Sequence, residues 1–221
     1  MLNRKIRAEY ESFTLAWGRL CAAAGITPNV ITGTSVAIAV GSCYFFAINR
    51  IFAALVLFGL VGLLDMLDGA TARASGRVTR YGQVLDMVSD RYAEFLFLLG
   101  IMLGGRVADY WVLAAVFGML MASYTRAVAE SKGGLESCEV GVVGRAEKMI
   151  IIAAGGLLQI LVDKTALPDF GPLQLGVVIT AVTSLYTAMQ RLRFAAIQLN
   201  SSEQTSAAIE RDRVGGAEGP Q

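Results

Sequence analysis

Residues 63–100 read LLDMLDGATARASGRVTRYGQVLDMVSDRYAEFLFLLG, and they place four aspartates in one of the most apolar parts of the chain. Asp65 and Asp68 are three residues apart, and Asp86 and Asp90 are four apart. On an α-helix, both spacings put two side chains on one face. The connection ASGRVTRY is short enough to make the two helices antiparallel neighbours. The sequence therefore predicts that four carboxylates converge at one depth.

The rest of the chain is also apolar, since 55% of its 221 residues are hydrophobic and 17% are charged. This composition is typical of a membrane protein. A spanning helix needs ~20 predominantly apolar residues, and six segments approach that length. They are Val30–Ile48, Ile51–Arg73, Gly82–Gly104, Asp109–Ser131, Ala146–Asp163 and Gly171–Ala195. The sequence predicts an all-α integral membrane protein with six transmembrane helices, and the aspartate pairs lie within the second and third.

The distribution of positive charge predicts the orientation of these spans. The chain has 19 lysines and arginines, and six spans would leave all but Arg50, Arg106 and Lys164 on one side. Cytoplasmic flanks retain positive charge during insertion. We therefore expect a multi-pass protein of the cell membrane, with both termini and the aspartate site facing the cytoplasm.

The two ends of the chain differ from the six-span domain, which is expected over residues 27–199. Residues 3–24 mix apolar and charged side chains, which predicts an amphipathic juxtamembrane helix within a cytoplasmic segment 1–26. A soluble collar is the alternative. Residues 200–221 are polar and rich in Gly, Ser and Glu, which predicts a disordered cytoplasmic tail. No removable signal peptide is expected.

The residues around the aspartates indicate a metal site. Oxygen-only ligands in a chain without histidine suit a hard cation such as Mg²⁺, Mn²⁺ or Ca²⁺. Four carboxylates could hold two divalent ions ~3.5–4 Å apart, an arrangement that stabilises the attacking and leaving oxygens of a phosphoryl displacement. Gly69 and Gly82 leave room for a ligand, and Arg73 offers a guanidinium to phosphate. For any single aspartate, the alternative is a buried ion pair with an arginine such as Arg91.

The aspartates belong to a longer pattern. It runs Asp65-x-x-Asp68-Gly69-x-x-Ala72-Arg73 and then, after eight residues, Gly82-x-x-x-Asp86-x-x-x-Asp90. This pattern resembles the signature of the CDP-alcohol phosphotransferases, and the likeness extends over about residues 25–195. The resemblance implies a phosphotransferase for substituted phosphate groups, which moves a phosphoryl-alcohol from a CDP-linked donor to an alcohol and releases CMP. It also implies two Mg²⁺ ions, with Mn²⁺ as the alternative.

The resemblance assigns roles to single residues. It makes Asp65 and Asp86 ligands of both metals, Asp68 a ligand of one, and Asp90 a ligand of the other as well as the general base. The positions that it implies for the CDP-lipid are Pro28, Asn29, Val30, Ile31, Gly69, Arg73, Thr79 and Gly82. From the residues alone, the stretch TPN at 27–29 is also an ordinary helix start.

Basic residues at the cytoplasmic ends of the last three predicted spans indicate an anion site. The stretches SYTRAVAES, VGRAEKM and QRL are similar to those of phosphatidylinositol-phosphate and archaetidylinositol-phosphate synthases. This likeness implies that Arg126, Arg145 and Arg191 bind the phosphate of inositol 1-phosphate, with Lys148 as an alternative to Arg145. For each residue alone, the positive-inside rule is an equal explanation.

The expected partners are a CDP-linked lipid (CDP-diacylglycerol or CDP-archaeol), a phosphorylated alcohol and membrane lipids, with no nucleic acid. Glycerol 3-phosphate is the alternative acceptor, serine fits less well because it has no phosphate, and a soluble CDP-inositol donor remains open. In another class, a divalent-cation transporter also carries acidic residues in its spans. That reading leaves the pattern DGxxAR and the basic residues unexplained.

A homodimer is also implied by the resemblance. The third and fourth predicted spans contain small residues that allow helices to approach closely. They are Gly100, Gly104, Gly105, Ala114, Ala115 and Gly118. From the residues alone, these positions could equally serve packing within one subunit.

Overall fold

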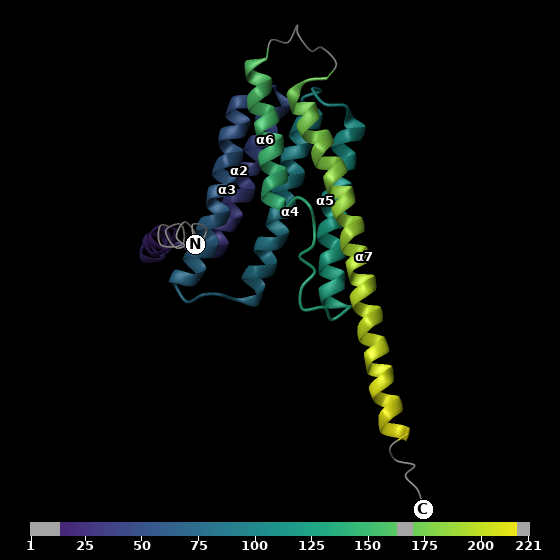
Figure 1. Cartoon of the computed structure of the whole chain (residues 1–221). Helices are drawn as coiled ribbons and strands as arrows, with labels where there is room; N and C mark the ends of the chain where they lie inside the picture. Colours follow the sequence, from purple (N-terminus) through teal and green to yellow (C-terminus); the bar gives the residue numbers. More distant parts are fainter. Residues whose placement is uncertain (1–13, 163–169, 216–221) are drawn as a thin grey trace, which may run out of the picture. The chain divides into compact units, whose positions relative to one another are not determined.

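The computed structural model describes residues 14–162 and 170–215, and every regular element in these ranges is an α-helix. The helices are α2 (Pro28–Ala47), α3 (Ile51–Ala74), α4 (Arg80–Leu103), α5 (Asp109–Ser131), α6 (Arg145–Leu161) and α7 (Pro172–Gly215) (Figure 1). Each of the six predicted segments corresponds to one helix, and no start differs by more than two residues, whereas α7 continues beyond the predicted end at Ala195. The all-α prediction is confirmed for the described residues.

Four of these helices are long and apolar enough to cross a membrane, namely α2, α3, α5 and the part of α7 from Pro172 to Ser201. Charged residues interrupt α4, including Asp86, Asp90 and Arg91. The described part of α6 has 17 residues. These findings support a membrane protein, whereas the count of six spans remains a prediction.

The ends of the chain contain more helix than the composition indicates. Residues 14–23 are helical, and residues 3–13 of the predicted amphipathic helix lie outside the described residues. A disordered tail was expected from residue 200, but α7 continues to Gly215. Residues 200–214 contain no glycine or proline, and extending an existing helix avoids the cost of nucleating a new one. Residues 216–221 lie outside the described part.

The chain forms two compact units. The first comprises Met1–Val112 and Ile152–Val177, and the second comprises Leu113–Ile151 and Val178–Gln221. The aspartate stretch belongs to the first unit, with α2, α3 and α4. The basic residues predicted for the acceptor belong to the second.

The core of the first unit joins α2 to both α3 and α4, which lie beside it (Figure 1). Phe97 of α4 is 0% exposed. Its ring packs edge-on against Phe46 of α2, with centroids 5.0 Å apart, and stacks on Phe58 of α3 at 3.8 Å. Ser42 of α2 donates a hydrogen bond of 2.9 Å to the carbonyl of Ala54 in α3. Because α2 contacts both helices, it fixes the positions of the two aspartate pairs relative to each other.

Small residues of α4 and α5 are used for packing inside the chain. In the first unit, a Cβ on Gly100 would lie 2.6 Å from the carbonyl oxygen of Cys43, so no side chain fits where α4 meets α2. In the second unit, a Cβ on Gly118 of α5 would lie 3.0 Å from the Cβ of Ser184 in α7. Internal packing, the alternative left open by the sequence, accounts for these two glycines.

Candidate metal centre and phosphate-binding residues

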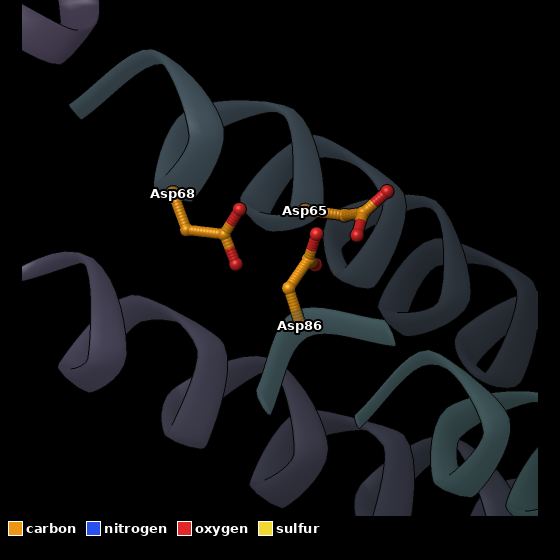
Figure 2. A group of neighbouring side chains, drawn as sticks. All are labelled: Asp65, Asp68 and Asp86. Carbon is orange, nitrogen blue, oxygen red and sulfur yellow. The ribbon is translucent and has the colours of Figure 1, made fainter. Parts of the chain in front are cut away.

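Three of the four aspartates meet in the first unit. Asp65 and Asp68 project from α3 and Asp86 from α4, and Figure 2 shows the three carboxylates grouped together. One oxygen of each lies within 4.8 Å of one oxygen of each of the others. The spacing of three residues on α3 and the short connection to α4 produce this convergence, as the sequence predicted for these three residues.

The donor set of this carboxylate group (Asp65, Asp68 and Asp86) fits a hard divalent cation. Two unit charges 4 Å apart repel by ~4 kcal/mol at an effective dielectric constant of 20, so three such carboxylates need a nearby positive charge. Asp68 is only 4% exposed, and Thr32 of α2 donates a hydrogen bond of 2.6 Å to its Oδ2. Carboxylate oxygens are the ligands that such a cation prefers.

Asp90 lies outside the carboxylate group. It follows Asp86 by four residues on α4, which is a rise of ~6 Å along the helix, and it is half-buried. Arg91 forms an ion pair of 2.9 Å with Glu94. The metal and base roles of Asp90 therefore remain predictions.

A cavity of about 330 Å³ adjoins the carboxylate group. Asp68 and Asp86 line it, together with residues from the start of α2, the end of α3 and the start of α4. Of the residues predicted for the CDP-lipid, it brings together Pro28, Asn29, Gly69, Arg73, Thr79 and Gly82. Val30 and Ile31 are not part of its lining, because Val30 is exposed on the surface of α2 and Ile31 is buried in the core.

Thr79 and Gly82 also have a local structural function. Thr79 is the N-cap of α4, and its hydroxyl accepts a hydrogen bond of 2.9 Å from the backbone N–H of Gly82. A Cβ at Gly82 would lie 3.0 Å from that hydroxyl and 3.7 Å from Oδ1 of Asn29. A side chain at this position would enter the cavity, so glycine keeps the space beside the cap open.

The sequence reasoning missed several residues of this site. Thr32, which contacts Asp68, lies directly after the predicted stretch at 28–31. Arg77 and Gln83 also line the cavity. Arg77 follows Arg73 by four residues, and this spacing of two arginines in the sequence could have identified it. Nothing in the sequence distinguished Thr32, because its role depends on the packing of α2 against α3.

In the second unit, two of the predicted acceptor residues lie around the connection between α5 and α6. Arg126 forms ion pairs of 2.9 Å with Glu130 and 2.7 Å with Glu139. Arg191 donates hydrogen bonds to the carbonyls of Val140, at 2.9 Å, and Ala122, at 2.6 Å. Both guanidiniums therefore hold residues 139–140 in place, and any incoming phosphate would compete with these contacts.

A buried cysteine completes this network. The backbone N–H of Cys138 donates a hydrogen bond of 2.9 Å to Glu130. Burial raises the pKa of the Cys138 thiol. The thiol therefore stays neutral and acts as a small apolar group beside Ala129 and Ala195.

The other two predicted acceptor residues lie at the start of α6. Arg145 is exposed there, whereas Lys148 is 4% exposed. Because Arg145 is exposed, it is more accessible to a soluble anion than Lys148. The sequence left open which of the two contacts the acceptor phosphate, and we expect Arg145 to do so.

Comparisons with known proteins agree with the motif and with the carboxylate group. Residues 25–189 match the sequence model of CDP-alcohol phosphatidyltransferase. The chain is 34% identical to archaetidylinositol phosphate synthase of Pyrococcus horikoshii over 189 residues, which cover 85% of this chain and 93% of that relative. It is 36% identical to archaetidylinositol phosphate synthase of Methanothermobacter thermautotrophicus over 162 residues, covering 73% and 78%. The chain belongs to the CDP-alcohol phosphatidyltransferase family, which confirms the resemblance.

Solved structures of one relative share the fold. Phosphatidylinositol phosphate synthase of Mycobacterium tuberculosis with CDP-DAG bound aligns with a TM-score of 0.71 and 28% identity, over 82% of this chain and 92% of that one. The same enzyme in complex with manganese and citrate gives a TM-score of 0.71 at 28% identity, over 82% and 88%. The protein is thus a transferase of the phosphotransferase type.

Proposed function

We propose that the protein transfers a phosphatidyl or archaetidyl group from a CDP-linked lipid to inositol phosphate and releases CMP. The observation that supports this proposal best is the carboxylate group beside a cavity that Arg73 lines. Curated relatives that are 34% and 36% identical carry the name archaetidylinositol phosphate synthase, which favours inositol phosphate as the acceptor.

CMP release tests this proposal directly. Purified protein in nanodiscs would be given CDP-archaeol or CDP-diacylglycerol with a panel of phosphorylated polyols. Inositol 1-phosphate is expected to support the fastest release. If CMP is released with glycerol 3-phosphate but not with inositol 1-phosphate, glycerol 3-phosphate is the acceptor. If no combination of CDP-lipid and polyol releases CMP, the divalent-cation transporter is favoured.

In the proposed reaction, Asp90 accepts the proton of an inositol phosphate hydroxyl. That oxygen attacks the β-phosphorus of the CDP-lipid, and the bond from this phosphorus to the bridging oxygen breaks, so CMP leaves with the bridging oxygen. Arg73 holds the diphosphate through charge-assisted hydrogen bonds. Divalent metal, proposed as two Mg²⁺ or Mn²⁺ ions on Asp65, Asp68, Asp86 and Asp90, would stabilise the charge that builds on the diphosphate.

The proposal includes a membrane arrangement. Six spans within residues 27–199 would place the carboxylate group toward the cytoplasm, preceded by the juxtamembrane segment 1–26 and followed by a cytoplasmic tail, residues 200–221. The family resemblance also supports a homodimer. A mass measurement in nanodiscs that finds only monomer would contradict the dimer.

The acceptor site leads to a prediction about Arg191. Replacing Arg191 with alanine should raise the KM for inositol phosphate about tenfold to over a hundredfold, because each lost charge-assisted contact is worth ~1.5–3 kcal/mol. The KM for the CDP-lipid should change little. Arg193 is the matched control, since it is exposed on the same helix and lies two residues, and so ~200° around the helix axis, from Arg191. Equal losses for Arg191→Ala and Arg193→Ala would contradict the assignment.

Glu139 should compete with the acceptor phosphate for Arg126. Its side chain is 67% exposed and pairs with that guanidinium. Exposed ion pairs are worth ~0.2–1 kcal/mol, so Glu139→Gln should lower the KM for inositol phosphate by about 1.5- to fivefold. Steady-state kinetics would measure this change. Glu136→Gln, which neutralises another exposed acid of the same connection, should have no effect. An unchanged KM for Glu139→Gln would show that the phosphate does not bind at Arg126.

A further inference from the structure

A second cavity, of about 650 Å³, lies in the first unit where α2 turns into α3. Arg50 directly precedes α3, and Asp68 follows much later on the same helix. At 1.5 Å per residue, the two residues are roughly 27 Å apart along the helix axis. The cavity is therefore separate from the carboxylate group, and the proposed reaction does not use it.

The polar part of this cavity is positively charged. Arg50 and Arg106 line it, together with Asn49 and Gln159. Arg106 donates a hydrogen bond through Nε to Oδ1 of Asn49, and Nδ2 of Asn49 donates one of 3.0 Å to the carbonyl of Gly104. This chain of bonds holds the guanidinium of Arg106 at the rim. No aspartate or glutamate of the described residues lines the cavity, so neither guanidinium is neutralised there.

The presence of both arginines at this end of the helices needs an explanation. They are two of the three basic residues that the sequence places on the side depleted of positive charge. The positive-inside rule disfavours them there. Two exceptions to the rule that share one cavity point to a ligand with negative charge.

The remaining wall of the cavity is apolar. Ile51, Phe52, Ile160 and Val162 contribute to it. Phe52 is 66% exposed and stands in the first turn of α3, which is a candidate membrane span. A ligand in this cavity would therefore meet positive charge on one side and apolar surface on the other.

We propose that this cavity binds a phosphate group, carried either by the headgroup of an anionic phospholipid or by a free phosphate. Guanidinium groups match the geometry of phosphate and form charge-assisted hydrogen bonds with it. The amides of Asn49 and Gln159 offer further polar atoms, and the apolar wall accommodates the glycerol and first methylenes of a lipid. This site does not depend on which alcohol the enzyme uses.

Native mass spectrometry of the full-length protein tests the lipid source. The protein is incubated in detergent with equal amounts of phosphatidylglycerol and phosphatidylcholine. The wild type should retain phosphatidylglycerol preferentially. Arg50→Gln and the double variant Arg50→Gln/Arg106→Gln should lose this preference, by about tenfold or more for each guanidinium. Arg193→Gln, which removes an exposed charge from the second unit, should keep it.

Inorganic phosphate alone tests the other source. It is titrated against lipid-free protein while the midpoint of thermal unfolding is measured, because a ligand that binds only the folded state raises it. A rise that is larger for the wild type than for Arg50→Gln identifies free phosphate, whereas a difference only with phosphatidylglycerol identifies the headgroup.

The folding of the variants is checked by their CMP release. The Arg50 side chain forms no hydrogen bond or ion pair with described residues, and its backbone bonds do not depend on the side chain. Arg50→Gln should therefore retain activity, and it keeps the test valid if the double variant fails to fold. Equal responses of wild type and Arg50→Gln to both ligands would overturn the proposal. So would an equal loss of lipid preference in Arg193→Gln.

Discussion

Replacing Asp86 with asparagine should abolish CMP release and weaken Mn²⁺ binding by more than about a hundredfold. Asp86 is the member of the carboxylate group that α4 contributes. Changes to groups that only support metal ligands already cost about 10–100-fold in affinity, so the loss of a direct ligand should exceed that range. Titration with Mn²⁺ followed by electron paramagnetic resonance would measure the affinity, and a parallel assay would measure CMP.

Asp109→Asn is the matched control for this experiment. Asp109 is an exposed aspartate in the first turn of α5, and the substitution makes the same change from carboxylate to amide. It should leave both Mn²⁺ affinity and CMP release unchanged. Wild-type Mn²⁺ affinity in Asp86→Asn would show that the carboxylate group does not hold the metal.

Asp90→Asn should reduce turnover by about 10²–10⁴-fold, which is the usual effect of losing a general base. Binding of the CDP-lipid should be largely retained, because Arg73 and the carboxylate group remain. Single-turnover CMP release and lipid binding would be measured on the same preparation. Residual activity above ~1% of the wild type would remove Asp90 from the role of base.

The two aspartate variants should also differ in their response to metal. Asp90 lies outside the carboxylate group, so Asp90→Asn should weaken Mn²⁺ binding less than Asp86→Asn does. Equal losses of affinity would show that Asp90 contributes as much to metal binding as Asp86 does. Mn²⁺ titrations of both variants under identical conditions would decide between these arrangements.

Local sequence patterns were sufficient to predict the helices and the three members of the carboxylate group. Predominantly apolar segments marked α2 to α7 in the sequence, although charged residues interrupt α4 and α6 has only 17 residues. The spacing of Asp65 and Asp68 defines a common face, and the short connection to α4 brings Asp86 to it. These features depend only on residues that are close together in the sequence, so they could be predicted from it.

Features that depend on packing between distant segments were not predictable in this way. The pair of Arg126 with Glu130 follows from a spacing of four residues. Its second pair, with Glu139, requires the fold of the connection after α5. The contact between Thr32 and Asp68 requires α2 to lie against α3. The length of α7 was missed because a polar composition was read as disorder, although nothing in residues 200–214 ends a helix.

The contact between Gly100 and Cys43 makes the carboxylate group sensitive to a distant position. Gly100 lies on the same helix as Asp86, roughly 21 Å along its axis at 1.5 Å per residue, and no Cβ fits where its backbone meets α2. A side chain at residue 100 would push this part of α4 away from α2. Because a helix is rigid, the resulting tilt would displace its other end as well. The carboxylate of Asp86 would move relative to Asp65 and Asp68, although no residue of the site had changed.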